Sequence, residues 1–337
     1  MSNQRLLAVG LLLAWACLST VAGAESAAAP EPDEPLPSPA PAEQPADDSL
    51  FEFLNAPHHE VSTGLEWLSK RMDTFFSNER IYAESTGSYA KLSGSTIIRE
   101  NGEQSFFGDL SVRVELPHTK EKLKLIIETD ADENLENRPD QQSQPTPNDT
   151  LRSTSYFAGV EKAVAEDGAW QVKTSAGLKV RSPLDPFVRL RISRDIYFSY
   201  WKFRFTETLF HFHSTGTGYT TVLEWDRPMS RTDLFRIYTS ATWWDNSDHY
   251  DLSQSFIFYH QLTERRALSY SIGAFGTNKP SIQADTYLFD IRYRQLLHKD
   301  WLFAEVNPQV LYEKARDFKP EHSLTLKLEM IFGEDYL

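Results

Sequence analysis

The sequence contains a single cysteine and, beyond its first residues, no long hydrophobic run, and each shortage excludes a class of protein. Cys17 lies in the N-terminal leader, so the mature chain would contain no cysteine and could form neither a disulfide bond nor a cysteine-based metal or catalytic site. No later stretch holds about 18 consecutive apolar residues, the length that a transmembrane helix requires. The net charge of -14 argues against a nucleic-acid partner.

The first 24 residues have the three parts of a secretory signal peptide. Arg5 supplies the positive charge, residues 6–21 form the apolar stretch, and the Ala-Gly-Ala sequence at 22–24 gives the cleavage site. A lipoprotein signal is a poorer match, because Ala14 stands where such signals usually have Leu. We therefore expect a signal peptide over 1–24 and a mature protein that begins at Glu25 and is exported.

After residue 80 the chain alternates apolar and polar residues in short segments. Leu324, Leu326 and Leu328 alternate with Thr325 and Lys327, as in a strand with one apolar and one polar face. A soluble sandwich could also show this pattern, but an even run of such segments after a signal peptide favours an all-β fold, an antiparallel transmembrane β-barrel over 81–337. We expect about fourteen strands, with roughly twelve as the alternative. The expected strands cover residues 86–98, 104–115, 121–130, 151–163, 169–181, 186–196, 200–212, 218–228, 231–245, 249–262, 265–277, 283–296, 300–314 and 321–333.

Two features of these segments fit a barrel in a membrane. The connections after odd-numbered segments are the longer ones, such as 131–150, and those after even-numbered segments are mostly tight, such as 263–265. Long outer loops and short periplasmic turns are typical of outer-membrane barrels. The chain is 13% aromatic, and four of its tryptophans lie near strand ends, where aromatic side chains mark the membrane interface. These are Trp170, Trp201, Trp243 and Trp301.

Two segments precede the barrel. Residues 25–60 are rich in Ala, Pro and Glu, a composition that cannot form a packed core, and we expect a disordered periplasmic linker. Residues 61–80 favour an amphipathic helix, because Thr63 and Glu66 form a capping box. Its apolar face carries Leu65, Leu68, Met72, Phe75 and Phe76. The helix could pack against the periplasmic end of the barrel or enter the lumen as a plug; we prefer packing, because a plug in a polar lumen needs less apolar surface.

Charged residues occur at positions expected to face the lumen. A basic ladder on one wall comprises Lys173, Lys179, Arg181, Arg189, Arg191, Lys202, Arg204 and Arg236. Carboxylates are expected along the rest of the lumen, at Asp109, Glu115, Glu128, Asp290, Glu305, Glu313 and Glu329. Opposed walls of unlike charge would orient and select polar solutes. Alternatively, the charges pair across the lumen and close it.

Catalytic and metal sites have weaker support. The sequence from His211 to Gly216 is similar to the His and Ser motif of outer-membrane phospholipase A, but Ser214 is adjacent to His213 and three residues from His211. A His and a Ser on opposite faces of a strand cannot exchange a proton, so we expect no enzyme activity. The acidic segment at 130–136 lacks the Gly of a calcium loop. We expect no catalytic residue, no metal site and no cofactor.

The chain from about Trp67 onward resembles porin-like outer-membrane β-barrel proteins of proteobacteria for which no activity is known. The resemblance is carried by residues 72–76, 79–80, 123–128 and 185–187, and by a C-terminal strand similar to the assembly signal of such proteins, although Phe332 is not terminal. It implies a location in the cell outer membrane of a Gram-negative bacterium. The implied partners are outer-membrane lipid, lipopolysaccharide and the outer-membrane assembly machinery.

Three functions fit this interpretation. The preferred one is transport through a passive porin-like channel for small polar or anionic solutes. The alternatives are a non-conducting scaffold barrel whose linker and helix act in the periplasm, and a barrel enzyme that acts on lipids. Pairing of the basic ladder with carboxylates would favour the scaffold, whereas a His, a Ser and an amide on one strand face would favour the enzyme.

Overall fold

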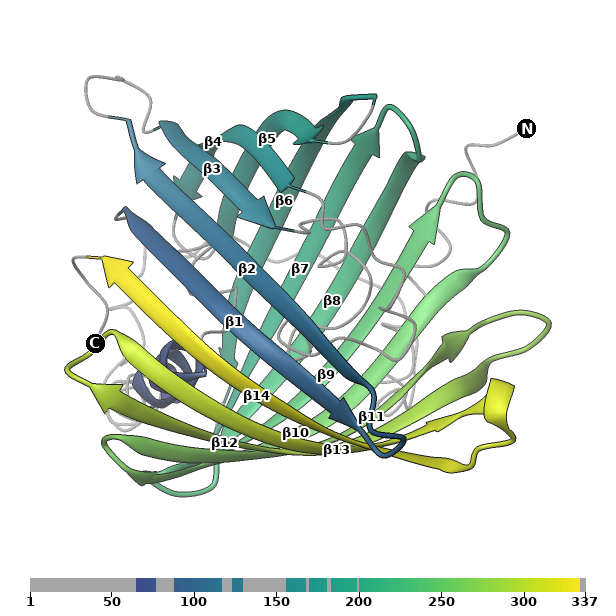
Figure 1. The fold of residues 1–337 in the computed structure, drawn as a ribbon. Helices are drawn as coiled ribbons and strands as arrows, with labels where there is room; N and C mark the ends of the chain where they lie inside the picture. Colours follow the sequence, from purple (N-terminus) through teal and green to yellow (C-terminus); the bar gives the residue numbers. More distant parts are fainter. Residues whose placement is uncertain are drawn as a thin grey trace, which may run out of the picture. The chain divides into compact units, whose positions relative to one another are not determined.

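A computed structural model describes residues 65–76, 88–116, 123–129, 156–167, 170–180, 183–198 and 200–333. The expected signal peptide and linker lie outside these residues. In the described part, fourteen antiparallel strands form one closed barrel in which sequence neighbours pair throughout (Figure 1). The strands are β1 Tyr89–Arg99, β2 Gln104–Glu115, β3 Leu123–Thr129, β4 Tyr156–Asp167, β5 Trp170–Val180, β6 Asp185–Phe198, β7 Trp201–Phe212, β8 Gly216–Pro228, β9 Asp233–Trp244, β10 Tyr250–Thr263, β11 Arg266–Thr277, β12 Gln283–His298, β13 Leu302–Glu313 and β14 Pro320–Gly333. Each expected strand is present, so the prediction of a β-barrel with fourteen strands is confirmed.

The barrel closes where its first strand meets its last. β1 pairs with β14 from Tyr89 opposite Gly333 to Arg99 opposite Ser323. Every strand therefore has two hydrogen-bonded neighbours, and no sheet edge is left unpaired among the described strands. A short 3₁₀ helix, η3 Lys314–Arg316, lies in the connection between β13 and β14.

The two faces of each strand differ in burial as the alternation predicts. On β9, Leu234 is 0% and Arg236 2% exposed, because their side chains point into the barrel. Phe235 and Ile237, between and after them, point outward and are only partly buried. Residues directly opposite on neighbouring antiparallel strands share a face, so this assignment extends around the barrel through the register.

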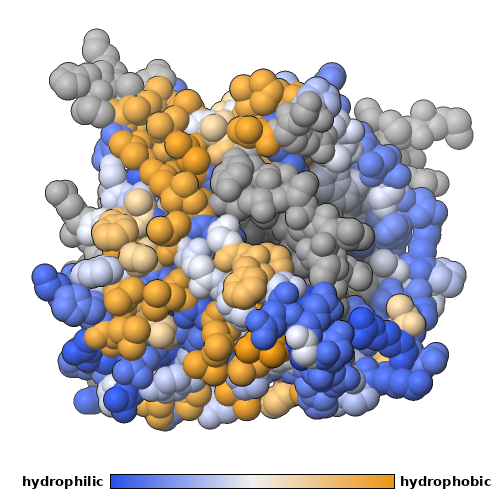
Figure 2. Space-filling model, viewed as in Figure 1, coloured by the Kyte–Doolittle hydropathy of each residue, from blue (hydrophilic) through white to orange (hydrophobic). Residues whose placement is uncertain are grey.

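Large apolar side chains are exposed on the outer face. They include Leu92, Leu125, Val160, Val188, Leu209, Phe256, Ile272, Phe289, Val306, Leu326 and Leu328, each at least 36% exposed. Figure 2 shows apolar patches over this surface and hydrophilic residues gathered toward the lower right, near the β1–β2 and β13–β14 connections. A soluble monomer rarely exposes so much apolar surface, whereas a barrel in lipid requires it. Trp170 and Trp201 begin their strands, and Trp243 and Trp301 lie beside strand ends.

A helix over residues 65–75 lies against the inward face of the barrel wall (Figure 1, purple). Among the described residues, no helix is long and apolar enough to cross a membrane. The buried apolar face of the helix packs on inward-facing residues of six consecutive strands, β9 to β14. They are Leu234, Tyr238, Ile257, Tyr259, Ala267, Leu296, Phe303 and Ile331. The helix thus occupies the lumen at one end of the barrel, the position that we did not prefer from the sequence.

The reason for this difference is the composition of the lumen at that end. We expected a polar lumen throughout, but apolar side chains of one cluster face inward at the starts of β9, β11 and β13 and near the ends of β10, β12 and β14. They meet the helix in edge-to-face and tilted ring pairs, such as Phe75 with Phe303 at 5.8 Å and Phe76 with Tyr259 at 5.3 Å. An apolar helix face can therefore enter the barrel without contacting water.

The longest connection between consecutive strands, residues 130–155 between β3 and β4, lies at the end of the barrel away from the helix. At the helix end, the short segments 229–232, 264–265 and 299–301 join β8 to β9, β10 to β11 and β12 to β13. At the other end, the 245–249 and 278–282 connections are joined by Lys279 Nζ, which donates to Asp248 Oδ2 at 2.6 Å. This hydrogen bond lowers the pKa of Asp248 below its ordinary value.

The facing of β14 can be tested with two arginine substitutions. Leu326→Arg would place a charge on the outer apolar face near mid-strand, and we expect it to lower the free energy of unfolding by about 2 to 4 kcal/mol in lipid vesicles. Ser323→Arg is the matched control, because Ser323 faces inward on the same strand and is only partly buried. Reversible denaturant unfolding measures both. Equal losses at the two positions would show that the outer face does not contact lipid.

Candidate functional site

The basic ladder lies on the inward face of β5 to β9. Its described members are on one side of their strands, as the register shows: Lys173 lies opposite Arg191, and Arg236 lies opposite Asp226. Members placed on the inward face are Lys173, Lys179, Arg189, Arg191, Lys202, Arg204 and Arg236. Arg181 lies outside the described residues.

The carboxylates predicted for the lumen are distributed around the other strands. Those on the inward face well within their strands are Asp109, Glu128, Asp290, Glu305 and Glu329. Glu115 and Glu313 each end a strand. Glu115 is exposed there, and Glu313 lies 3.5 Å from Arg316 of η3. These two carboxylates are thus at the ends of the barrel.

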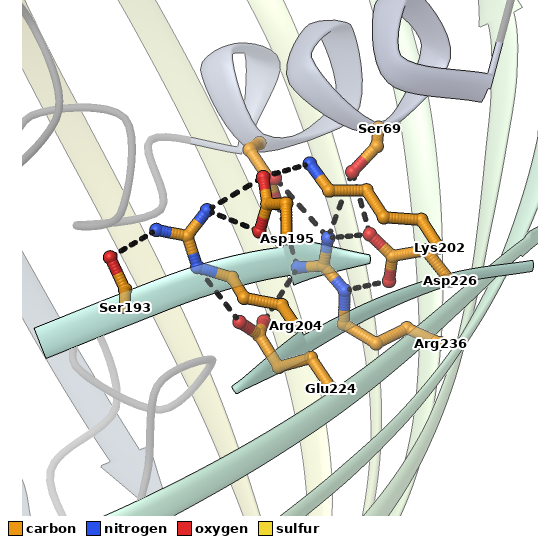
Figure 3. A network of polar contacts seen from close by, with 9 residues as sticks. Ser69, Ser193, Asp195, Lys202, Arg204, Glu224, Asp226 and Arg236 are labelled. Atoms are coloured by element: carbon orange, nitrogen blue, oxygen red, sulfur yellow. Dashed lines mark hydrogen bonds and ion pairs between the residues drawn. The ribbon is translucent and has the colours of Figure 1, made fainter. Parts of the chain in front are cut away.

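Arg236 on β9 lies at the centre of a buried network that joins the helix to the wall (Figure 3). Its Nε donates to Asp226 Oδ1 at 2.6 Å, and its Nη1 donates to Asp73 Oδ1 at 2.7 Å. All three side chains are at most 2% exposed. Ser69, also on the helix, donates to Asp226 Oδ2 at 2.6 Å. Because an unpaired charge is costly to bury, pairing with one guanidinium allows both carboxylates to leave water.

Two further members of the basic ladder belong to the same network (Figure 3). Lys202 Nζ lies 3.0 Å from Asp195 Oδ2, and Arg204 Nη1 donates to Asp195 Oδ1 at 3.2 Å. Glu224 lies 4.0 Å from Arg204 Nε and 3.7 Å from Arg236 Nη1. The three cations are therefore neutralised locally by carboxylates on neighbouring strands and on the helix.

Two smaller clusters repeat this mixed arrangement elsewhere in the lumen. Arg294 Nη1 lies 3.3 Å from Glu305, and its Nη2 also donates to Glu329. On β2, Arg113 donates through Nη2 to Glu128 at 2.6 Å and through Nη1 to Glu161 at 3.3 Å. In both clusters one guanidinium meets two carboxylates, and in the first cluster Arg292 also lies 3.5 Å from Glu305 and Lys327 lies 2.8 Å from Glu329.

The expectation of one basic and one acidic wall is therefore wrong. Arg113, Arg292, Arg294 and Lys327 lie on the strands that we expected to be acidic, and Glu224 and Asp226 lie among the basic ones. Neither predicted set of lumen charges includes Asp73, Glu161, Asp195, Glu224 and Asp226, or those four cations. The strand register would have indicated these ion pairs. Arg204 lies opposite both Asp195 and Glu224, and Arg294 lies opposite Glu305.

An aromatic cluster that was not predicted from the sequence lies inside the other end of the barrel. It consists of Phe157, Phe187, Phe210 and Phe212, each at most 4% exposed, with Trp244 packed against it. The ring centroids of Phe210 and Trp244 are 4.6 Å apart. A Cβ on Gly218, directly opposite Phe210, would lie 2.6 Å from its ring, so glycine is required for this ring to lie across the sheet.

The His211 motif has no catalytic arrangement among the described contacts. His211 Nδ1 lies 2.9 Å from Thr217 Oγ1, whereas the Ser214 hydroxyl donates to Asp185. The backbone N–H of Ser214 donates to the same carboxylate at 2.9 Å. These bonds cap the turn between β7 and β8 against the start of β6.

These features define the molecule as a closed β-barrel with an apolar outer face, a charged lumen and a helix inside one end. No protein-family model matches the chain, and no curated protein matches it. Similar solved structures include the outer membrane channel DcaP of Acinetobacter baumannii, with 12% identity, a TM-score of 0.44, and coverage of 73% of this chain and 96% of that chain. Pseudomonas putida OprB has 7% identity, a TM-score of 0.47, and coverage of 76% and 96%. At these values the likeness supports no statement about the solute or activity of this chain.

The network around Arg236 predicts a large effect of removing its central cation. Arg236→Gln would leave buried carboxylates without their shared partner, and we expect a loss of about 3 to 5 kcal/mol in the free energy of unfolding, together with easier proteolysis at the helix. Arg231→Gln is the control, because Arg231 is exposed in the turn between β8 and β9. Denaturant unfolding and limited proteolysis in vesicles compare the two. A loss no larger than that of the control would mean that the network does not hold the helix.

Proposed function

We propose that this protein is a barrel of the outer membrane that acts as a passive channel for small polar solutes and prefers anions. Its exposed apolar outer face supports a lipid environment, and assembly by the outer-membrane machinery with lipopolysaccharide on the outer side is part of the proposal. The helix and its linker would then lie on the periplasmic side, because the longest connection between strands, 130–155, is at the opposite end of the barrel.

One observation carries the proposal: the helix covers one side of the lumen and leaves charged residues on the other. Its described contacts are with β8 to β14. On the described inward positions of β5 and β6, four cations, Lys173, Lys179, Arg189 and Arg191, occur with two carboxylates, Asp185 and Asp195. Side chains alone do not fill a barrel of this many strands, so a path beside the helix would pass this cationic surface.

The second candidate is a scaffold barrel that does not conduct. The buried clusters around Arg236, Arg294 and Arg113 favour it, because paired charges fill lumen that would otherwise be open to water. This candidate and the channel share the fold and differ in whether ions cross. A His and Ser on one strand face, which would favour the lipid-acting enzyme, is not among the described contacts of His211 and Ser214.

Single-channel recording separates these functions. The purified full-length mature chain in planar bilayers should conduct, and in a potassium chloride gradient at low salt its reversal potential should indicate anion preference despite the net charge of -14. Low salt is chosen because screening of the lumen charges is then weakest. Heat-modifiable migration in electrophoresis checks that the barrel is folded. A folded barrel that never conducts would replace the channel with the scaffold.

A further inference from the structure

Arg189 differs from the paired members of the basic ladder in its contacts. Lys202, Arg204 and Arg236 each lie within 4.0 Å of a carboxylate. The contact of Arg189 is with a neutral group: its Nε donates to Ser175 Oγ at 3.1 Å. Among the described residues, no carboxylate lies within ion-pair distance of the Arg189 guanidinium. Its side chain is also only partly buried.

The hydrogen bond to Ser175 fixes the orientation of the Arg189 guanidinium. Ser175, directly opposite on β5, accepts from Nε, and among the described residues no group accepts from the two terminal nitrogens of Arg189. Within the same part of the chain, the Ser175 hydroxyl proton also has no acceptor. The carboxylate of Glu128 interacts electrostatically with Arg189 but lies outside ion-pair distance of it, and both Glu128 and Glu161 accept hydrogen bonds from Arg113.

The residues around Arg189 increase the electrostatic attraction between its guanidinium and an anion. Phe210 lies directly opposite on β7, and Phe187 lies two residues earlier on the same face of β6, both within the buried aromatic cluster. An apolar neighbour lowers the local dielectric constant and so strengthens attraction between opposite charges. On the other side, Arg191 and Lys173 lie opposite each other and add positive potential.

We propose that Arg189, together with Ser175, forms an oxyanion-binding site in the lumen that takes the carboxylate of a small organic acid. The planar guanidinium can donate two parallel hydrogen bonds to the two oxygens of a carboxylate. A spherical chloride ion cannot accept hydrogen bonds in this bidentate geometry. The inference rests on the proposed channel and adds a preferred solute class to it. The basic ladder thereby contains three cations that hold the structure, Lys202, Arg204 and Arg236, and one, Arg189, that binds the solute.

Permeation of acetate against chloride tests the site. In bilayers with acetate on one side and chloride on the other, we expect Arg189→Gln to lower the acetate-to-chloride permeability ratio about threefold or more, because charge-assisted hydrogen bonds are lost. Arg189→Lys keeps the charge and should keep anion preference over potassium, while losing the preference for acetate. Arg231→Gln removes the same charge outside the lumen and should behave as the wild type. Equal ratios in Arg189→Gln and Arg231→Gln would overturn the site.

A binding measurement tests the Arg189 site independently of whether the barrel conducts ions. The full-length mature chain in detergent is titrated calorimetrically with sodium acetate at constant ionic strength. Binding that weakens about tenfold in Arg189→Gln but not in Arg231→Gln supports the site even if no current is recorded. Conduction without any effect of Arg189 on acetate binding or permeability would leave the channel standing and remove the site.

Discussion

Hydrogen bonding between β1 and β14 is the constraint on which the rest of the structure depends. By pairing Tyr89–Arg99 with the last strand, the chain satisfies the backbone groups of both edge strands without a further partner. Closure then divides every strand into an outer and an inner face. The outer face can be apolar only if lipid covers it, and the inner face must bury whatever charges the alternation places there.

Burying those charges determines how the lumen is built. A guanidinium taken from water is tolerated when carboxylates meet it with good geometry, and Arg236, Arg294 and Arg113 each meet at least two. In the first cluster one of the carboxylates, Asp73, belongs to the helix, so the same ion pairs that satisfy the wall also hold the helix in place. Apolar packing of Phe75 and Phe76 adds stabilisation that does not depend on charge.

Strand positions could be predicted from the sequence because alternation is a local property. Each strand, such as Pro320–Gly333, carries its own period of two, and neither the partner strand nor the register is needed to recognise it. Ion pairs are different, because Arg204 meets Asp195 and Glu224 only once three strands are aligned. The placement of the helix depended on a further fact, the apolar composition of one end of the lumen, which spans strand ends far apart in the sequence. The aromatic cluster has the same origin.

The number of charged residues along a strand is therefore a poor predictor of the electrostatic field in the lumen. Lys202 and Arg189 looked equivalent in the sequence, since both alternate with apolar residues on the same wall. The register places Asp226 opposite Lys202, whose Nζ also lies 3.0 Å from Asp195. Arg189 has Ser175 opposite it on one side and Phe210 on the other. A cation in contact with a carboxylate contributes little field beyond its own pair, whereas Arg189 interacts with Glu128 only beyond ion-pair distance and retains more of its field in the lumen. In the channel that we propose, selectivity therefore depends on the residue that lies opposite each charge.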